Sequence, residues 1–283
     1  MNSRVLVGIV TCNRADILPK AIQSALEQTF PALEVAVIDD GSRDATPTVS
    51  SQFPEVTWKR RDKSEGYMSA RNEFMERSGF SYFVSLDDDA WFLKGDEIQV
   101  AINYLESHPE VGALGFDILS PDRPDTRERS APIPAAMFIG CGHVVRLSAL
   151  DSVGMYDPVP GGYGGEEKDL CLRLLDAGFH VVTLPGVHVW HDKTPVAREL
   201  YKQHRSGVCN DLAMTLRRTP AFALPIALPM KFLRHLQFAW SRGLIKPCLR
   251  GFALFIRNSP SLWKSRRPLR LDTLKAFVRL SRG

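Results

Sequence analysis

A chain of 283 residues can bury one large core, or a core with an appended segment, and 44% hydrophobic with 24% charged residues excludes a disordered or fibrous protein. Five scattered cysteines without a CxxC spacing argue against a disulfide framework or a zinc site, and for reduced thiols in the cytoplasm. No run reaches the roughly 18 apolar residues that a membrane span needs.

The net charge of +4 is unevenly distributed. Residues 221–283 hold thirteen Lys or Arg and one acid, Asp272, so this segment carries +12 and the rest of the chain −8. A basic tail favours anionic partners. Of these we expect lipid headgroups, and we do not expect nucleic acid.

The chain opens with a predicted βαβ unit. Continuous apolar runs at 5–10 and 33–38 predict strands buried in a parallel sheet, and residues 16–28 place apolar side chains on one face of a helix. Polar clusters at 11–14 and 39–42 follow the two strands. They should lie on the edge of the sheet where ligands bind in α/β proteins.

Strands and helices continue to alternate up to about residue 191. We predict strands at 56–58, 80–84, 111–118 and 179–184, an interrupted apolar stretch at 135–145, and helices at 66–78, 96–107 and 166–177. Residues 120–134, rich in Pro, Asp and Arg, predict a mobile loop, and residues 158–165 predict a flexible glycine-rich loop.

Three consecutive carboxylates, Asp87, Asp88 and Asp89, follow the apolar run at 80–84. They repel one another, and a hard divalent cation would hold them together, because Mg2+ and Mn2+ prefer oxygen ligands and often join carboxylates to a substrate's phosphates. The alternative is a solvated acidic turn. The position at the end of a strand favours a ligand site.

Beyond about residue 195 the predicted helices carry apolar faces beside Lys and Arg. Phe238 and Trp240, for example, lie among Arg234 and Arg242. Interleaved aromatic and basic side chains suit a helix lying in a membrane interface. The alternative is a helical appendage packed on the sheet with a solvated basic face.

These motifs together resemble the family 2 glycosyltransferases, including those that build bacterial cell-surface glycans, which have the A-type (GT-A) nucleotide-sugar-binding fold. The matching segments, in the family's order, are Val7–Arg14, Ala25–Phe30, Val37–Thr46, Ala70–Asn72, Asp87–Asp89 and Gly165–Arg173. The resemblance covers about residues 4–195. It implies a Rossmann-like, mixed and mainly parallel sheet flanked by helices, with a catalytic domain at 1–195 and a basic helical region at 196–283.

The resemblance assigns a donor site residue by residue. Thr11 and Asp40 would hold the nucleoside, with the carboxylate accepting the N–H of a uracil- or thymine-type base. The turn residues Asn13 and Arg14 would belong to the same site. Arg71 would meet the diphosphate, a task suited to its planar fork of donors.

Asp87 and Asp89 are the two ends of the family's D-x-D pattern. The resemblance implies that Asp89 is the direct metal ligand and that Asp88 faces the sugar or ribose. His191 stands where many relatives place a histidine that joins the metal or the diphosphate, although a packed side chain is an equal alternative. The metal would bridge the two phosphates and stabilise the departing nucleoside diphosphate.

A second carboxylate cluster would supply a base, because an acceptor hydroxyl must lose its proton as it attacks the sugar. In the family the base is the acid of a Glu-Asp pair, which is Glu166-Glu167 here, so Glu167 occupies the base position. Glu166 and Asp169 remain open as alternatives. These acids could also merely favour a helix N-terminus electrostatically. A base opposite the leaving group implies inversion at the anomeric carbon.

We therefore expect a metal-dependent, inverting glycosyltransferase of the hexosyltransferase type, using Mn2+ or Mg2+. It would move a sugar from a UDP- or dTDP-type donor to a hydroxyl of a glycan or lipid-linked acceptor, in the cytoplasm or at the inner membrane face. One alternative is a sugar nucleotidyltransferase, although the turn after Val10 lacks the Gly- and Arg-rich loop usual in that class. The other is a non-catalytic module that binds anionic polymers or membranes.

Overall fold

The computed structural model describes residues 3–124, 131–193 and 200–282. Its contacts divide the chain into two compact units, the first comprising residues 1–156 and 177–194 and the second residues 157–176 and 195–283. The predicted boundary between residues 195 and 196 lies outside the described residues and stays a prediction. The segment 157–176 groups with the C-terminal helices, although it precedes the last strand.

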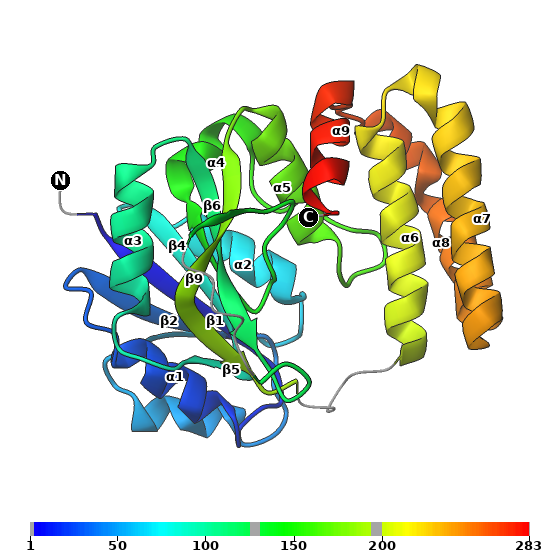
Figure 1. Cartoon of the computed structure of the whole chain (residues 1–283). Coiled ribbons are helices and arrows are strands. Elements are labelled where there is room, and N and C mark those ends of the chain that lie inside the picture. The colour runs from blue at the N-terminus through cyan, green and yellow to red at the C-terminus, as the bar shows by residue number, and fades with distance from the viewer. Residues whose placement is uncertain (1–2, 125–130, 194–199, 283) are drawn as a thin grey trace. The chain divides into compact units, whose positions relative to one another are not determined.

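In the part of the chain that the structure describes, the first unit is built on a nine-stranded sheet in the order β3-β2-β1-β4-β8-β6-β9-β5, with β7 paired to β9. Figure 1 shows this sheet with the helices around it. Its strands are β1 Val5–Thr11, β2 Leu33–Asp39, β3 Thr57–Arg60, β4 Tyr82–Asp87, β5 Ala90–Phe92, β6 Val111–Leu119, β7 Ile133–Pro134, β8 Gly142–Arg146 and β9 His180–His191. The first four strands in this order run parallel, and β9 runs parallel to β6. β8 runs antiparallel to both β4 and β6. The expected mixed sheet is therefore confirmed.

Helices cover both faces of this sheet. They are α1 Leu18–Leu26, α2 Tyr67–Met75, α3 Glu97–Ser107 and α4 Leu147–Val153, with a short 3-10 helix, η1, at Thr46–Gln52. Val5 and Val7 of β1 share a buried core with the apolar faces of α1 and α3. Gly8 points to the opposite face, where Phe74 of α2 lies against it. Side chains alternate along a strand, so β1 joins two hydrophobic layers.

Gly8 allows this close approach of α2 to the sheet. A Cβ at this position would lie 2.5 Å from Cδ2 of Phe74 and 2.7 Å from Cε2 of Phe83, and both rings are buried. We expect Gly8→Ala to lower the free energy of unfolding by about 1–3 kcal/mol, the usual cost of overpacking, as measured by urea titration. Gly207→Ala is the control, because nothing lies within 4 Å of a Cβ there. An unchanged unfolding midpoint for Gly8→Ala would mean that the two rings move aside without cost.

Several elements of the first unit differ from the predicted ones. The strand predicted at 179–184 continues to His191, because β9 first pairs with β6 and then also with β5. The short strand β5 and the helix α4 were not predicted. In the segment predicted as a mobile loop, Ser120 and Arg123 form an isolated bridge and β7 pairs with β9, while residues 125–130 lie outside the described residues.

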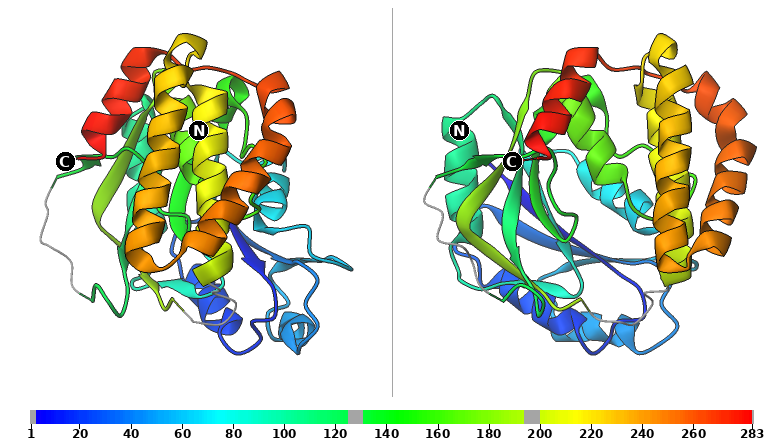
Figure 2. Two further views of the ribbon diagram at one scale, coloured as in Figure 1. Left: turned by 90° about the vertical axis from the view of Figure 1, so that its right-hand side faces the viewer. Right: turned by 45° about the vertical axis from the view of Figure 1, so that its right-hand side comes forward.

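The second unit is helical, which confirms the expected helical C-terminal region. Its helices are α5 Glu166–Asp176, α6 Leu200–Arg218, η2 Ala221–Ala223, α7 Leu224–Arg242, α8 Ile245–Lys264 and α9 Leu271–Leu280. The three long helices α6, α7 and α8 lie side by side (Figure 2) around a buried core that includes Leu212, Ala239 and Phe255. No helix within the described ranges is long and apolar enough to cross a membrane.

Candidate functional site

The acidic triplet lies where β4 ends, at the carboxyl edge of the parallel strands. Asp87 is the last residue of β4, and β5 begins at Ala90. β5 pairs antiparallel with the end of β9, so that Ala90 is opposite His191, and the backbone N–H of Asp192 donates to the carbonyl of Asp89 at 2.9 Å. This pairing brings His191 from far along the sequence to the triplet.

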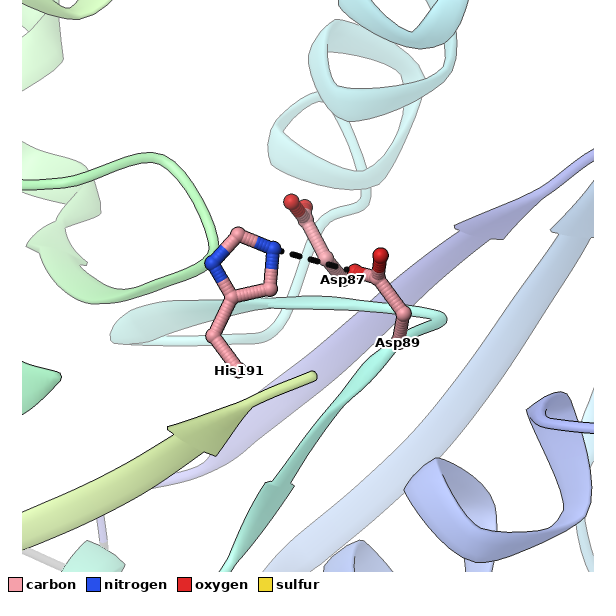
Figure 3. Close-up of side chains that lie close together, drawn as sticks. All are labelled: Asp87, Asp89 and His191. Atoms are coloured by element: carbon pink, nitrogen blue, oxygen red, sulfur yellow. Dashed lines mark ion pairs between the residues drawn. The ribbon is translucent and has the colours of Figure 1, made fainter. Parts of the chain in front are cut away.

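The side chains of Asp87, Asp89 and His191 form a compact cluster (Figure 3). One ligand atom from each lies within 4.8 Å of the others, and Nε2 of His191 is 3.2 Å from Oδ1 of Asp89. Two carboxylate oxygens and an imidazole nitrogen are a donor set that suits a divalent cation such as Mn2+. The three residues therefore could hold a metal, with further positions open to the oxygens of a substrate.

Two arginines flank the cluster. Nη2 of Arg71, on α2, donates to Oδ1 of Asp87 at 2.7 Å and to the carbonyl of Gly140 at 3.1 Å. Nη1 of Arg14, in the turn after β1, lies 3.6 Å from Oδ2 of Asp89. Both arginines were expected at the donor site, and the structure brings them to the outer carboxylates of the triplet. Each offers a fixed positive charge next to the place that a diphosphate would occupy.

The central carboxylate, Asp88, turns toward the end of β1. The hydroxyl of Thr11 donates to its Oδ2 at 2.8 Å. Burial raises the pKa of Asp88 to about 7, and Asp87 and Asp89 add to this effect, while Arg14 and Thr11 oppose it. Asp88 is thus hydrogen-bonded to Thr11, which the resemblance had grouped with Asp40. The expected role of Asp88 toward the sugar or ribose stays a prediction.

Asn13 shapes the turn rather than pointing into the cluster. Its φ of 57° lies in the left-handed region that asparagine tolerates better than most residues. Its side-chain oxygen accepts from the N–H of Arg43 at 2.7 Å, and its own N–H donates to Ser42 at 2.8 Å. The turns that follow β1 and β2 are therefore tied together, which fixes the backbone that carries Arg14.

Asp40 is buried, and the surrounding protein occupies both of its carboxylate oxygens. Oδ1 accepts from Arg61 and the N–H of Glu65, and Oδ2 accepts from Ser64 and the N–H of Gly66, all at 2.6–3.0 Å. Burial raises the pKa of Asp40, but these hydrogen bonds outweigh it and hold the pKa below its ordinary value. In this arrangement Asp40 anchors the segment 61–66.

Its neighbour Asp39 was not among the predicted site residues. Unlike Asp40, it has a carboxylate oxygen that accepts no hydrogen bond from the described residues. Oδ1 of Asp39 accepts from the N–H of Ser42 at 2.9 Å. Oδ2 is buried and accepts no hydrogen bond within the described part of the chain, with Nε of Arg60 at 3.6 Å as an ion-pair contact. A buried carboxylate oxygen usually has a donor, so Oδ2 of Asp39 could accept a hydrogen bond from a ligand. The only signal in the sequence was the Asp-Asp pair itself.

The predicted base residues lie on the first turns of α5 in the second unit. Glu166 is 1% exposed, whereas Glu167 is half-buried. Asp169 accepts from Nε and Nη2 of Arg218 at 2.6 and 2.8 Å and from Nε of Arg173 at 2.9 Å. Burial raises the pKa of Asp169, but Arg218 and Arg173 outweigh it and hold the pKa below its ordinary value. A carboxylate so firmly kept ionised is a weak proton acceptor.

The glycine-rich segment before α5, predicted as a flexible loop, is hydrogen-bonded to α6. Asn210 of α6 accepts from the N–H of Gly161 at 2.7 Å and donates to the carbonyls of Tyr163 and Gly164 at 2.9 and 2.7 Å. The hydroxyl of Ser206 donates to the carbonyl of Gly161 at 2.7 Å. These contacts fix the entry to α5 and therefore the position of Glu167.

Solved structures with the same fold support the GT-A assignment. TarS of S. aureus aligns with a TM-score of 0.63 and 14% identity over 93% of this chain and 83% of that one. The mannosyltransferase PcManGT from Pyrobaculum calidifontis, in complex with GDP-Man and Mn2+, aligns with a TM-score of 0.62 and 18% identity over 99% of this chain and 79% of that one. The chain thus has the A-type fold of nucleotide-sugar enzymes.

The amino-acid sequence is similar to those of glycosyltransferases from bacteria and archaea. An uncharacterized glycosyltransferase of Rickettsia prowazekii is 25% identical over 169 residues, which are 54% of this chain and 53% of that protein. The glycosyltransferase AglE of Haloferax volcanii is 25% identical over 222 residues, or 72% and 71% of the two chains. The match spans about half the length of the Rickettsia relative. Residues 6–152 match the sequence model described as "Glycosyl transferase family 2", and the chain therefore belongs to family 2 of the glycosyltransferases.

Proposed function

We propose that this glycosyltransferase is metal-dependent and inverting, and that it moves a hexose-type sugar from a nucleoside-diphosphate donor to an acceptor hydroxyl. The observation that carries the proposal is the cluster of Asp87, Asp89 and His191, whose ligand atoms lie within 4.8 Å of one another at the carboxyl edge of the sheet. Mn2+ or Mg2+ bound there would neutralise charge on the donor's diphosphate as the bond to the sugar breaks.

The residues around the cluster divide the work of holding the donor. Arg71 and Arg14 would bind the diphosphate oxygens, because guanidinium groups pair well with phosphate. Asp88, held by Thr11, would accept hydrogen bonds from sugar or ribose hydroxyls. These contacts orient the anomeric carbon and exclude water from it.

The base of the nucleoside would be read by a carboxylate at the end of β2. We retain a UDP- or dTDP-type donor, whose base offers one N–H to a carboxylate. Asp39 suits this role better than Asp40, because its buried Oδ2 accepts no hydrogen bond within the described residues, whereas both oxygens of Asp40 are occupied. Among the similar structures, one of TarS is a complex with UDP-GlcNAc and that of PcManGT contains GDP-Man, so the base is the property that most needs measurement.

For the acceptor, the proposal assigns Glu167 as the general base. It would take the proton of the attacking hydroxyl from the face opposite the departing diphosphate, which gives inversion. Its half-exposed side chain can meet a substrate, whereas Glu166 is buried and Asp169 is held by arginines. The acceptor would be a glycan or a lipid-linked precursor, and the basic second unit would bring the enzyme to the membrane surface that carries it.

A thermal-shift experiment tests the donor site. We expect UDP or dTDP with Mn2+ to raise the melting temperature by about 5 °C or more at a hundredfold excess over Kd, because the ligand binds only the folded state. Neither the nucleotide alone nor Mn2+ alone should do so. In Asp89→Asn the joint effect should vanish, since one metal ligand is lost.

Asp151→Asn is the matched control, because Asp151 is an exposed carboxylate on α4 outside the site and its loss should leave the shift unchanged. A full shift in the absence of metal, or a full shift in Asp89→Asn, would contradict the metal site. A thermal shift with GDP, and none with UDP or dTDP, would mean that the donor's nucleobase is guanine and not uracil or thymine.

A further inference from the structure

Helices α7 and α8 carry apolar side chains on two different sides. The inner sides contribute Phe232, Ala239 and Phe255 to the core shared with α6, and the rings of Phe232 and Phe252 lie 4.6 Å apart. A helix packed against a bundle needs only one such face. The second apolar side is therefore not explained by the folding of this unit.

The outer side of η2 and α7 is a continuous apolar stripe. Its members are between 57% and 80% exposed and follow one another at intervals of four, four, three and seven residues, which places them on one face of a helix. They are Phe222, Ile226, Met230, Leu233 and Trp240.

The outer side of α8 repeats an apolar residue followed by a base at every seventh position. Leu249, Ile256 and Trp263 are 52%, 61% and 56% exposed, and each is followed by an exposed base. These bases are Arg250, Arg257 and Lys264. A spacing of seven residues keeps all the apolar side chains on one face and all the bases along one flank of it.

The bases along these helices are available to an outside partner. Arg234, Lys246, Arg257 and Lys264 are exposed and form no ion pair among the residues that the structure describes, in contrast to Lys231, whose ammonium lies 2.7 Å from Asp211. The sequence has no Asp or Glu between residues 221 and 271. Neither helix thus carries an acid that could neutralise these charges.

We propose that the outer faces of α7 and α8 form a docking surface for an anionic lipid bilayer. Apolar side chains, with Trp240 and Trp263 among them, would enter the boundary between headgroups and acyl chains, and the flanking bases would pair with anionic headgroups. A second copy of this chain would instead set like charges against each other. Nucleic acid would use the bases but would leave the apolar stripe in water.

This inference deepens the membrane association proposed above, but its test needs neither donor nor acceptor. Failure of membrane binding and failure of the donor site are therefore separate results. The experiment is flotation of the full chain with vesicles of phosphatidylcholine containing one-third phosphatidylglycerol, compared with pure phosphatidylcholine vesicles. We expect binding to the anionic vesicles that weakens strongly when the salt concentration rises.

Two pairs of substitutions separate the apolar and the basic contributions. Trp240→Ser with Ile256→Ser should weaken binding by about tenfold or more. Arg257→Gln with Lys264→Gln should weaken it about thirtyfold at low salt, since each base near an anionic surface contributes a factor of about five. All four side chains are exposed, so the fold should be kept.

The matched controls are exposed residues of the first unit. Leu93→Ser with Val100→Ser, and Lys63→Gln with Lys94→Gln, should bind vesicles like the unchanged chain. Equal binding by the stripe variants and their controls would overturn the proposal, as would no binding to anionic vesicles at all. A lipid-free dimer that Trp240→Ser with Ile256→Ser dissociates would also overturn it, in favour of a second copy. Binding to RNA that only the basic substitutions weaken, without vesicle binding, would overturn it in favour of nucleic acid.

Discussion

Glu167→Gln is expected to lower kcat by about 10²–10⁴, the usual contribution of a positioned general base, while the donor-dependent thermal shift is unchanged. The amide keeps the size of the carboxylate and removes its ability to take a proton. Because only the acceptor's proton transfer is affected, KM for the donor should change little. Initial rates with saturating donor, and single turnovers of preformed enzyme–donor complex, measure this.

The neighbouring acids supply the comparison. Glu166→Gln should cost much less activity, because Glu166 is 1% exposed and cannot readily meet a substrate hydroxyl. The pH profile gives a second readout, since its acidic limb reports the ionisation of the base and should disappear in Glu167→Gln. If Glu167→Gln kept its activity and Glu166→Gln lost it, the base would be Glu166 and not Glu167.

Much of the first unit was readable because its signals are local. The apolar runs that became β1, β2 and β4 are continuous in sequence, and each ends in the polar residues that form the site edge. The acidic triplet alone left two interpretations open, a cation site and a solvated turn, and its position at the end of a strand favoured the first. The pairing of strands that are far apart in the sequence, such as β5 with β9, could not be predicted. This pairing decides whether His191 is a packed side chain or a neighbour of Asp89.

The choice between Asp39 and Asp40 illustrates a second limit. Adjacent residues at a strand end point to opposite sides, and either could face a ligand. The choice depends on the segment 61–66, which folds back so that Arg61, Ser64 and two backbone N–H groups fill the oxygens of Asp40. No short pattern in the sequence predicts that the segment 61–66 folds back onto Asp40.

The buried ion pairs of the second unit could not be predicted from the sequence either. They bear on which acid of α5 could act as a base. Asp169 was left open as an alternative to Glu167, while its partner Arg218 is 49 residues away and was not singled out from the sequence. Once paired, the two side chains are almost fully buried. Asp169 and Arg218 therefore have a structural role in this arrangement, which supports Glu167 over Asp169 as the proposed base.

Arg218→Met is expected to destabilise the second unit by about 3–5 kcal/mol, the usual cost of removing one partner from a buried ion pair. Arg218 is 1% exposed, and its guanidinium binds both oxygens of Asp169 and reaches Asp157 as well. Arg173 and Arg217 still pair with Asp169 and Asp157 and compensate part of their negative charge. We therefore expect a loss near about 3 kcal/mol, the lower end of the range. The loss of stability in Arg218→Lys should be smaller than that in Arg218→Met, because lysine keeps the positive charge but cannot bind both oxygens of Asp169 as the guanidinium does.

Hydrogen exchange of the α6 amides in the full chain measures this stability, and a loss near 3 kcal/mol corresponds to about 150-fold faster exchange through global opening. Arg270→Met is the matched control, because Arg270 pairs with Asp176 while its own side chain is 68% exposed, and exposed pairs contribute at most about 1 kcal/mol. At acid pH the exchange rates of Arg218→Met and the unchanged chain should become more alike. The folded-state pKa of Asp169 is lowered, so its stabilising effect is complete above the ordinary pKa near 4 and is lost as the pH falls toward the folded-state pKa. Equal exchange rates in Arg218→Met and Arg270→Met would mean that the buried network contributes no more than a surface pair, and that Asp169 is free to be reconsidered as a base.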